Sequence, residues 1–211
     1  MFTGIVQGMA EVVALEKKQG LHRLAIRLPD GLNQRVTLGA SIALNGVCMT
    51  VSQFADGIVE FDAMAETLTL TSLGDLTVGD KVNVERSAKQ GDEIGGHLVS
   101  GHVDGIASVV TIDTTENNQR VAYELPETAM PYLFKKGFIS FDGCSLTIAD
   151  IDKSQRLIWV SYIPETLRVT VHGVRQVGDR VNFEIDRQTQ AIVDTVKQLL
   201  QENPELLRAD S

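Results

Sequence analysis

The chain contains the same unit of about 90 residues twice. The block IALNGVCMTV, starting at Ile42, aligns with ISFDGCSLTI, starting at Ile139, at an offset of 97 residues. Further along, VGDKVNVE from Val78 aligns with VGDRVNFE from Val177, with six identities in eight and an offset of 99. A duplicated unit provides two similar pockets, and differences between the copies let them take different roles. We therefore predict two domains, in an enzyme that handles two similar molecules at once.

Composition and charge exclude several classes of partner. The net charge is −9, from 19 basic and 28 acidic residues, whereas a nucleic-acid-binding domain needs a basic face. No apolar run approaches the length of a membrane-spanning helix, and the start MFTGIVQG lacks the features of a signal peptide. Cys48 and Cys144 do not align in the repeat, and no Cys/His spacing resembles a zinc ligand set. We expect a cytoplasmic protein with reduced thiols, no metal, and neither nucleic acid nor membrane as a partner.

Short runs rich in Val, Ile and Thr, separated by Gly and Asp, predict an all-β barrel or sandwich. In the first unit the expected strands are residues 11–14, 23–28, 41–44, 48–53, 58–62, 68–72 and 81–85. In the second unit they include residues 120–124, 137–141, 146–149 and 157–161. The dipeptides Asn45-Gly46 and Asp142-Gly143 predict type I′ hairpin turns, which need positive φ at both central positions.

The repeat also predicts the domain boundaries. Residues 1–88 and 97–186 are expected to form the two domains, joined by the polar, Gly-rich segment 87–97, with a short helical turn at 127–132. The clearest helix covers residues 187–202 and belongs to a terminal unit, residues 187–203. Its apolar residues form one stripe at helical spacing: Ile192, Val193, Val196, Leu199 and Leu200. Such a stripe needs a cover, either the neighbouring barrel or other copies of the helix, and we favour self-association.

Five motifs follow one another in the right order across the two halves: MFTGIV, GASIALNGVCMTV, GGHLVSGHVDG, KGFISFDGCSLTI and the pair ETLTLT/ETLRVT. Together they resemble the riboflavin synthase family (α-chain type) over nearly the whole chain. The resemblance implies two tandem six-stranded Greek-key barrels plus a C-terminal amphipathic α-helix. It also implies a homotrimer, with each active site between the N-barrel of one subunit and the C-barrel of a neighbour, and makes lumazine synthase a candidate partner.

The activity that the resemblance implies is a dismutation without metal or redox cofactor. One molecule of 6,7-dimethyl-8-ribityllumazine donates a four-carbon unit to a second one. The products are riboflavin and 5-amino-6-(ribitylamino)pyrimidinedione. Because the methyl group at C7 is already acidic, the main task of such an enzyme is to hold two flat rings in reacting geometry.

The resemblance further implies two lumazine pockets. The first is expected to contain Gly4, Ile5, Val6, Cys48, Met49 and Thr50, with a strand of Asp62, Ala63, Met64, Ala65, Glu66 and Thr67. The second is expected to contain Gly101, His102, Val103, Ser145, Leu146, Thr147, Ser161, Tyr162, Ile163, Pro164, Glu165 and Thr166. Lys136 corresponds to a lysine that reaches across from another subunit.

Six residues correspond to residues implicated in catalysis: Phe2, Ser41, Cys48, His102, Ser145 and Asp186. His102 can move the methyl proton, because imidazole titrates near neutral pH. Ser145 can hydrogen-bond the acceptor lumazine or assist addition of a nucleophile at its C7. No base adjoins Ser145 in the sequence, so no Ser-His-Asp triad is predicted.

Five of these six candidates also have a purely structural explanation. His102 fits a surface loop, Ser145 fits a strand beside a turn, and Phe2 fits an aromatic side chain tucked into a barrel. Asp186 directly precedes the terminal helix, where an N-cap is expected. Cys48 fits a small buried side chain, and we expect its replacement by Ser to be milder than replacement of Ser145 by Ala.

Two other functions compete with the enzyme. A non-catalytic lumazine- or flavin-binding fluorescent protein binds one ligand per chain and tends to lose residues of the second pocket, whereas His102, Ser145, Thr147 and Asp186 are all present. A flavin-binding barrel of an electron-transfer reductase carries an Arg-x-Tyr-Ser motif and a nucleotide-binding domain. This chain has no such motif and no G-x-G-x-x-G after a strand, which disfavours that class.

Overall fold

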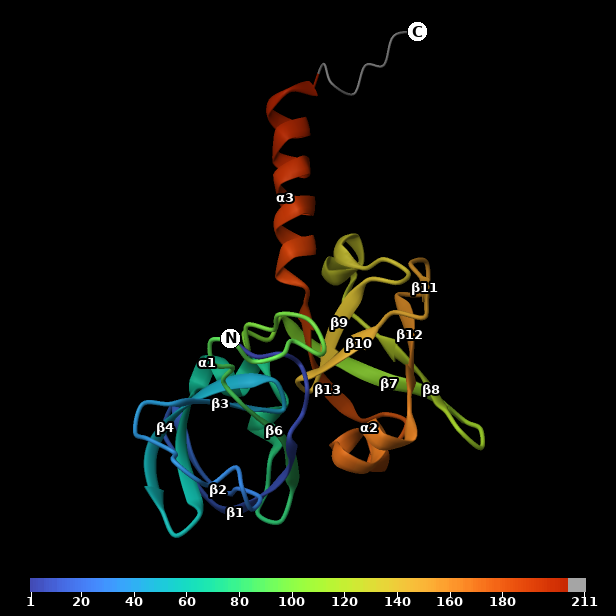
Figure 1. Ribbon diagram of the computed structural model, residues 1–211. Helices are drawn as coiled ribbons and strands as arrows, with labels where there is room; N and C mark the ends of the chain where they lie inside the picture. Colours follow the sequence, from blue (N-terminus) through green and yellow to red (C-terminus); the bar gives the residue numbers. More distant parts are fainter. Residues whose placement is uncertain (205–211) are drawn as a thin grey trace, which may run out of the picture.

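The protein consists of two antiparallel β units lying side by side and a C-terminal helix that stands away from both (Figure 1). The computed structural model describes residues 1–204. Within that range no helix has the length and apolar character needed to span a membrane. The all-β architecture with a terminal helix agrees with the fold class expected from the sequence.

The first repeat forms a closed six-stranded barrel. Its strands are β1 (Gly8–Lys18), β2 (Leu21–Arg27), β3 (Ser41–Leu44), β4 (Val47–Ala55), β5 (Ile58–Met64) and β6 (Lys81–Arg86). Their order is β1-β2-β5-β4-β3-β6, and β6 pairs back with β1. The consecutive strands β3, β4 and β5 thus lie between β6 and β2, which is the Greek-key arrangement. Between β5 and β6 the chain forms α1 (Ala65–Leu70) and the 3₁₀ helix η1 (Ser72–Asp75).

The second repeat has the same circular order, but one strand is divided. Its strands are β7 (Gly105–Thr114), β8 (Gln119–Glu124), β9 (Phe138–Phe141), β10 (Cys144–Thr147), β11 (Asp150–Asp152), β12 (Leu157–Tyr162) and β13 (Arg180–Ile185). Its short helices are η2 (Glu127–Tyr132), α2 (Pro164–Val169) and η3 (Val171–Val174). β10 and β11 lie at the two ends of a sheet ordered β10-β9-β13-β7-β8-β12-β11, and together they take the place of β4.

The chain segment between β10 and β11 still connects the two ends of the sheet by hydrogen bonds. The N–H of Ile148 donates to the carbonyl of Gly137 (2.9 Å), on the β9 side. The N–H of Ala149 donates to the carbonyl of Trp159 (2.7 Å), in β12. The second unit is therefore a barrel that is closed at this point by a bent chain segment rather than by a continuous ladder.

Two segments expected to be strands are partly helical. The expected strand at residues 68–72 lies in α1 and η1, and the expected strand from Asp62 to Thr67 stops at Met64. The six strands already close the barrel, so the chain after β5 finds no free edge to pair with. Thr71 instead accepts the N–H of Leu73 (3.3 Å) and donates to the carbonyl of Thr67 (2.7 Å), which joins the two helical turns.

The second repeat is built in the same way. β12 ends at Tyr162, one residue beyond the expected strand 157–161, and α2 begins at Pro164. Proline suits the first turn of a helix, because the N–H that it lacks has no partner there.

The two hairpin turns have the expected conformation and meet one another. φ is 44° at Asn45 and 78° at Gly46, and it is 44° at Asp142 and 82° at Gly143. A Cβ on Gly46 would lie 2.6 Å from the backbone nitrogen of Gly143, and the reverse substitution would bring a Cβ within 2.9 Å of the Gly46 nitrogen. The repeats therefore touch at two turns that leave no room for a side chain.

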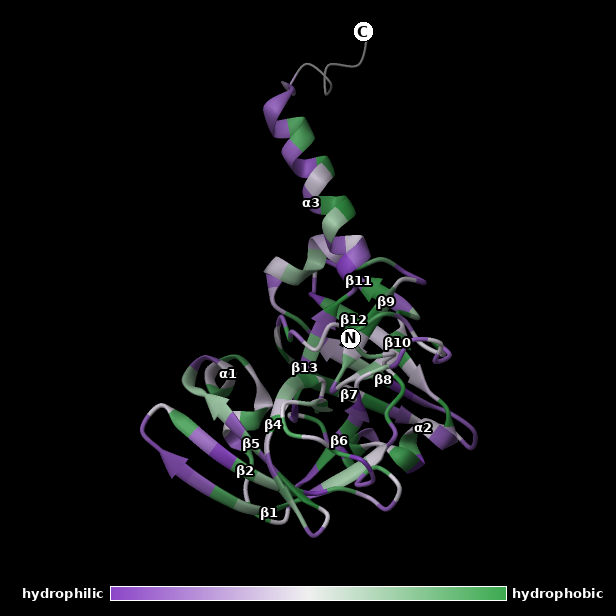
Figure 2. Cartoon of the chain, turned by 60° about the vertical axis from the view of Figure 1, so that its left-hand side comes forward, coloured by the Kyte–Doolittle hydropathy of each residue, from purple (hydrophilic) through white to green (hydrophobic). Residues whose placement is uncertain are grey.

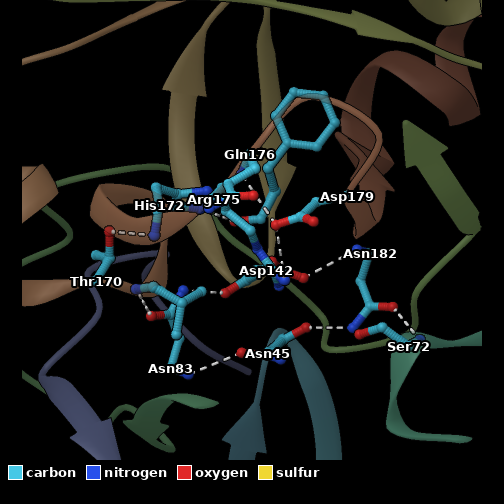
Figure 3. Close-up of polar contacts among 12 residues, drawn as sticks. Asn45, Ser72, Asn83, Asp142, Thr170, His172, Arg175, Gln176, Asp179 and Asn182 are labelled. Atoms are coloured by element: carbon cyan, nitrogen blue, oxygen red, sulfur yellow. Dashed lines mark hydrogen bonds and ion pairs between the residues drawn. The ribbon is translucent and has the colours of Figure 1, made fainter. Parts of the chain in front are cut away.

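A buried polar network surrounds these turns (Figure 3). Asn83 Nδ2 donates to the carbonyl of Asp142 (2.9 Å), and Asn182 Nδ2 donates to the carbonyl of Asn45 (2.8 Å). Asn83 and Asn182 are equivalent residues of β6 and β13, and each is 1% exposed. In the second repeat only, Arg175 Nη2 also donates to Asp142 Oδ2 (2.6 Å). These reciprocal contacts fix the position of one barrel against the other.

Each barrel has its own core. The first is built from aliphatic side chains around Phe61, among them Leu24, Ile26 and Leu44. The second is more aromatic and contains Tyr123, Phe141, Tyr162 and Phe183. Because the barrel interiors are filled, a ligand has to bind on the outside of the barrels.

The terminal helix α3 (Arg187–Glu202) makes few contacts with the rest of the chain. Asp186 caps its start, and Tyr132 Oη donates to Asp194 Oδ1 (2.6 Å). None of its side chains is buried, and Ile192 and Val196 are 65% and 49% exposed. Figure 2 shows apolar residues recurring along its length. The stripe is thus left uncovered by the part of the chain that the structure describes.

Candidate active site

Two equivalent segments, residues 1–6 and 98–103, form the first arm and the second arm of the molecule. The arms pair with one another, because Phe2 and Val99 exchange backbone hydrogen bonds of 2.8 and 3.0 Å. Each arm then lies on the opposite barrel. The N–H of Ser145 donates to the carbonyl of Gly4 (2.8 Å), and the N–H of Cys48 donates to the carbonyl of Gly101 (2.9 Å).

This exchange corrects the expected composition of the pockets. The family resemblance implies that Gly4 belongs with Cys48 and Gly101 with Ser145, and that grouping is wrong within one chain. Gly4, Ile5 and Val6 lie beside Ser145, and the second arm lies beside Cys48. The physical reason is that the two arms cross where they pair. Each arm therefore extends from its own barrel and contacts the opposite barrel.

Ser145 lies at the centre of a groove on the outer face of the second barrel. One part is a cavity of about 380 Å³ lined by Gly4, Ile5, Val6, Gln7, Cys144, Ser145, Glu165, Thr166, Val169 and Thr170. The other is a cavity of about 410 Å³ lined by Lys136, Ser145, Leu146, Thr147, Ala149, Ser161, Ile163 and Thr166. Ser145 and Thr166 belong to both parts. Each part falls within the size range of small-molecule pockets.

Lys136 lines this groove in its own chain. It has a left-handed backbone conformation (φ 70°), and its N–H donates to the carbonyl of Ile148 (2.8 Å). Lys136 therefore lies at the groove beside Ser145 of its own chain, whereas the resemblance implies that this lysine reaches across to another subunit.

His97 is a candidate functional residue that the sequence alone does not indicate. Its Nδ1 lies 2.6 Å from Ser145 Oγ, and its ring stacks on Phe138 with 5.2 Å between centroids. The side chain is 7% exposed, and this burial lowers its pKa, against an opposing effect of the Asp186 charge. A lowered pKa keeps the imidazole neutral near pH 7. A neutral imidazole hydrogen-bonded to a hydroxyl can accept its proton.

Asp186 serves both the helix and this pair. Its carboxylate accepts the N–H groups of Gln188 (3.3 Å) and Thr189 (3.1 Å), so the expected N-cap is present. Its charge also acts on His97 of the same chain. Ser145, His97 and Asp186 thus gather at one place within a single chain.

Four expected substrate-binding side chains point into the barrels. Met49, Ala63, Leu146 and Tyr162 are at most 8% exposed, because side chains alternate between the two faces of a strand. Tyr162 Oη lies 2.7 Å from Tyr123 Oη, and burial raises the pKa of both phenols. These residues can offer a ligand their backbone but not their side chains.

Phe2 and the residues near Cys48 occupy a small separate cluster. Phe2 is 1% exposed and packs with Ala43 and Val99, against which Cys48 is half-buried. Ser41 pairs with Thr50 across β3 and β4. Thr50 lies two residues after Cys48 in β4, and Ser41 lies two residues before Ala43, which is the β3 partner of Cys48. His102 is exposed at the end of the second arm.

Two expected carboxylates are held by arginines. Asp62 accepts hydrogen bonds of 2.8 and 3.0 Å from Arg23, which lower its pKa, and Glu165 is paired with Arg168 at 2.6 Å. Of the remaining expected residues, Val103 in the second arm is buried. The others lie exposed or half-buried around the ends of β5 and β12: Met64, Ala65, Glu66, Thr67, Ser161, Ile163, Pro164 and Thr166. Among residues 1–204, no group of three or more His, Cys, Asp or Glu side chains is arranged to hold a metal ion.

Comparison with known proteins identifies the family. A family model described as "Lumazine binding domain" matches residues 3–87 and residues 100–186. The chain is 48% identical to riboflavin synthase of Escherichia coli (strain K12) over 201 residues, which cover 95% of this chain and 93% of that protein. The chain belongs to the riboflavin synthase family. Another member, from Mycobacterium bovis, is 43% identical over 189 residues, covering 88% of this chain and 93% of its own.

The chain is also similar to solved structures of ligand complexes. The fold is similar to that of LumP complexed with 6,7-dimethyl-8-(1'-D-ribityl) lumazine, with a TM-score of 0.80 and 27% identity over 89% of this chain and 100% of that one. LumP complexed with riboflavin gives a TM-score of 0.82 and 28% identity with the same coverage. The expected family and its duplicated fold are thereby confirmed.

Proposed function

We propose that this chain is a riboflavin synthase that converts two molecules of 6,7-dimethyl-8-ribityllumazine into riboflavin and 5-amino-6-(ribitylamino)pyrimidinedione. A four-carbon unit moves from the donor to the acceptor, so no external oxidant or reductant is consumed. The 48% identity to an enzyme named riboflavin synthase, over 95% of the chain, carries this proposal. The Ser145–His97 pair in an open groove supports catalysis rather than binding alone.

In this proposal the groove at Ser145 holds one lumazine and the region of Cys48 faces the other. Neutral His97 accepts the proton of Ser145 Oγ, or of a nucleophile that Ser145 positions at C7 of the bound ring. Thr147, Ser161 and Thr166 supply polar groups near the ring and ribityl chain. The exposed His102 is positioned at the end of the second arm to move the methyl proton.

The oligomer and location follow as further parts of the proposal. We propose a homotrimer assembled through α3. The apolar stripe of this helix needs a cover, because its side chains Ile192, Val196 and Leu199 are 49–65% exposed. The groove at Ser145 is open on one side, which suits completion by a neighbouring subunit. The free thiols of Cys48 and Cys144 fit a reducing compartment such as the cytoplasm, and lumazine synthase is a candidate partner.

Turnover tests the function directly. The purified chain is mixed with 6,7-dimethyl-8-ribityllumazine in the presence of a chelator, and riboflavin and the pyrimidinedione are quantified. One riboflavin per two lumazines consumed is the expected result. Tight binding of one lumazine per chain without riboflavin would instead identify a carrier like the LumP structures, and absence of binding would reject both functions.

Replacing Gly4 with alanine is expected to disturb the groove specifically. A Cβ on Gly4 (φ +73°) would lie 2.6 Å from Ser145 Cβ, so the arm or the serine has to move. A displacement of this kind can cost roughly 10²-fold in rate, which we expect in kcat/KM. Gly20→Ala is the matched control, because Gly20 has the same φ of +73° and nothing within 4 Å of its Cβ. Equal losses of kcat/KM in both variants would show that backbone strain alone is responsible.

The pH dependence should follow His97. If neutral His97 is the active form, activity falls as pH drops through its pKa, which burial lowers from the ordinary value of a histidine. The Asp186 charge raises that pKa, so Asp186→Asn should move the acidic limb of the kcat profile to a still lower pH. Asn caps helices as well as Asp, so the helix start is preserved. An unchanged or upward-shifted limb in this variant would argue against His97 as the titrating group.

A further inference from the structure

Each barrel carries one buried glutamate at the end of its last strand. Glu85 in β6 is 4% exposed, and its carboxylate accepts the N–H of Thr3 (2.6 Å), the Thr3 hydroxyl (2.8 Å) and the N–H of Gly4 (3.1 Å). All three donors belong to the first arm. No lysine or arginine contributes to these contacts, so the carboxylate is compensated by hydrogen bonds from the arm.

Glu184 in β13 repeats this arrangement in the second barrel. It is 2% exposed and accepts the N–H of Ser100 (2.7 Å), the Ser100 hydroxyl (2.8 Å) and the N–H of Gly101 (2.9 Å). The repeat aligns Glu85 with Glu184 at an offset of 99, and it aligns the arms at an offset of 97. The duplication thus preserves a glutamate together with its three donors.

Burying a carboxylate is unfavourable, and desolvation raises the pKa of both glutamates, against the opposing charges of the N-terminus near Glu85 and of Arg187 near Glu184. Three hydrogen bonds to a charged acceptor offset this cost, since such bonds are stronger than neutral ones. Between themselves the arms are joined by the single backbone bridge of Phe2 and Val99. The glutamates are therefore the main polar attachment of each arm to its own barrel.

The far side of each arm contacts the opposite barrel. Gly4, held by Glu85, accepts the N–H of Ser145, and Gly101, held by Glu184, accepts the N–H of Cys48. A Cβ on either glycine would lie 2.6 Å from the Cβ of that serine or cysteine. The position of each candidate catalytic side chain thus depends on an arm that is fixed by a glutamate of the other barrel.

We propose that Glu85 and Glu184 are positioning residues that act crosswise, Glu85 on the Ser145 site of the second barrel and Glu184 on the Cys48 site of the first. The role in catalysis rests on the proposed function, whereas the crossed geometry does not. Each carboxylate holds its arm at the depth where the glycine contacts the opposite hairpin.

The two clamps differ in one respect. Arg187, the first residue of α3, lies 3.8 Å from Glu184, donates to Asp104 (2.9 Å) and also donates to the carbonyl of His102. The position equivalent to Arg187 in the first repeat is Ala88. The second arm is therefore also tied to α3, so the Cys48 side is linked to whatever surface covers that helix.

Thiol labelling tests the crossed arrangement without requiring turnover. Cys48 is half-buried against Gly101, whereas Cys144 is buried in the second barrel and burial raises its pKa to about 12, so it should label slowly. The full-length chain is treated with iodoacetamide, and the modification of each cysteine is followed by peptide mass spectrometry. We expect Glu184→Gln to accelerate Cys48 alkylation about tenfold. The substitution replaces the charged acceptor of the second arm with a neutral amide, which weakens the hydrogen bonds that hold Gly101 beside Cys48.

The matched variant is Glu85→Gln. Glu85 lies in the first barrel, as Cys48 does. This variant should change Cys48 alkylation less than about twofold, since its arm contacts Ser145 instead. If each glutamate only stabilised its own barrel, the pattern would reverse: Glu184→Gln would expose Cys144, and Glu85→Gln would expose Cys48. That reversed pattern, or unchanged labelling in both variants, overturns the proposal.

Kinetics then connects the clamps to the reaction. With riboflavin formation as the readout, Glu184→Gln and Glu85→Gln should each lower kcat about tenfold or more, because the reacting groups lose their geometry. Melting temperatures measured alongside separate this effect from unfolding. A chain that fails to make riboflavin at all, yet shows the crossed labelling, rejects the proposed function and leaves the crossed clamps supported.

Discussion

Replacing Ser145 with alanine should lower kcat by about 10²–10⁴-fold, the range expected when a group that handles a proton is lost. The serine hydroxyl is 2.6 Å from His97 Nδ1, and it lies in both parts of the groove on the second barrel. Alanine removes the hydroxyl while the β10 backbone bond to Gly4 is kept. Lumazine binding, measured by its fluorescence, should therefore change far less than kcat.

The partner variant tests whether the serine and the histidine act as a unit. His97→Ala and the double variant Ser145→Ala/His97→Ala should have nearly the same kcat as Ser145→Ala, because residues acting together are not additive. Additive losses would mean that the two side chains work separately. Cys48→Ser serves as the comparison on the other barrel and should be milder than Ser145→Ala.

Local sequence signals predict much of the fold. The Asn-Gly and Asp-Gly pairs specify turns with positive φ, and the structure has φ of 44° at both Asn45 and Asp142. The helix at residues 187–202 follows from the spacing of its apolar residues. The short helices after β5 and β12 are missed, because alternating Thr and Leu in residues 67–72 resembles a strand and only closure of the barrel removes the pairing edge.

The site is harder to predict, since it depends on contacts between the repeats. The repeat alignment makes each arm equally suited to either hairpin, so the exchange of arms is a property of three-dimensional structure alone. His97 is the last residue of the polar, Gly-rich segment 87–97, which the sequence predicts to be a linker. One signal was available: Gly96 precedes it, and a Cβ there would lie 2.6 Å from Ser145 Cβ. Successive glycines before a histidine indicate close approach of the backbone.

The seam between the barrels should be the most sensitive point for stability. Asp142 is fully buried, and Arg175 donates to its Oδ2 at 2.6 Å, as Figure 3 shows. Arg175→Leu leaves this carboxylate buried without its cation. Breaking a buried pair in this way costs about 3–5 kcal/mol. For a chain of this size that corresponds to a fall of roughly 6–20 °C in Tm, which differential scanning fluorimetry measures.

The first repeat shows how this loss can be repaired. Asn45 and Leu76 occupy the positions equivalent to Asp142 and Arg175, and Asn45 Oδ1 accepts the N–H of Asn83 (2.7 Å). Asp142→Asn combined with Arg175→Leu should therefore recover most of the stability, because a neutral amide keeps this acceptor and no charge remains buried. If the double variant melts as low as Arg175→Leu alone, the loss comes from packing of the arginine side chain and not from the unpaired carboxylate. Recovery would mean that neutral hydrogen bonds, as in the first repeat, can stabilise the contact between the barrels in place of the ion pair of the second repeat. The ion pair is then not required for folding.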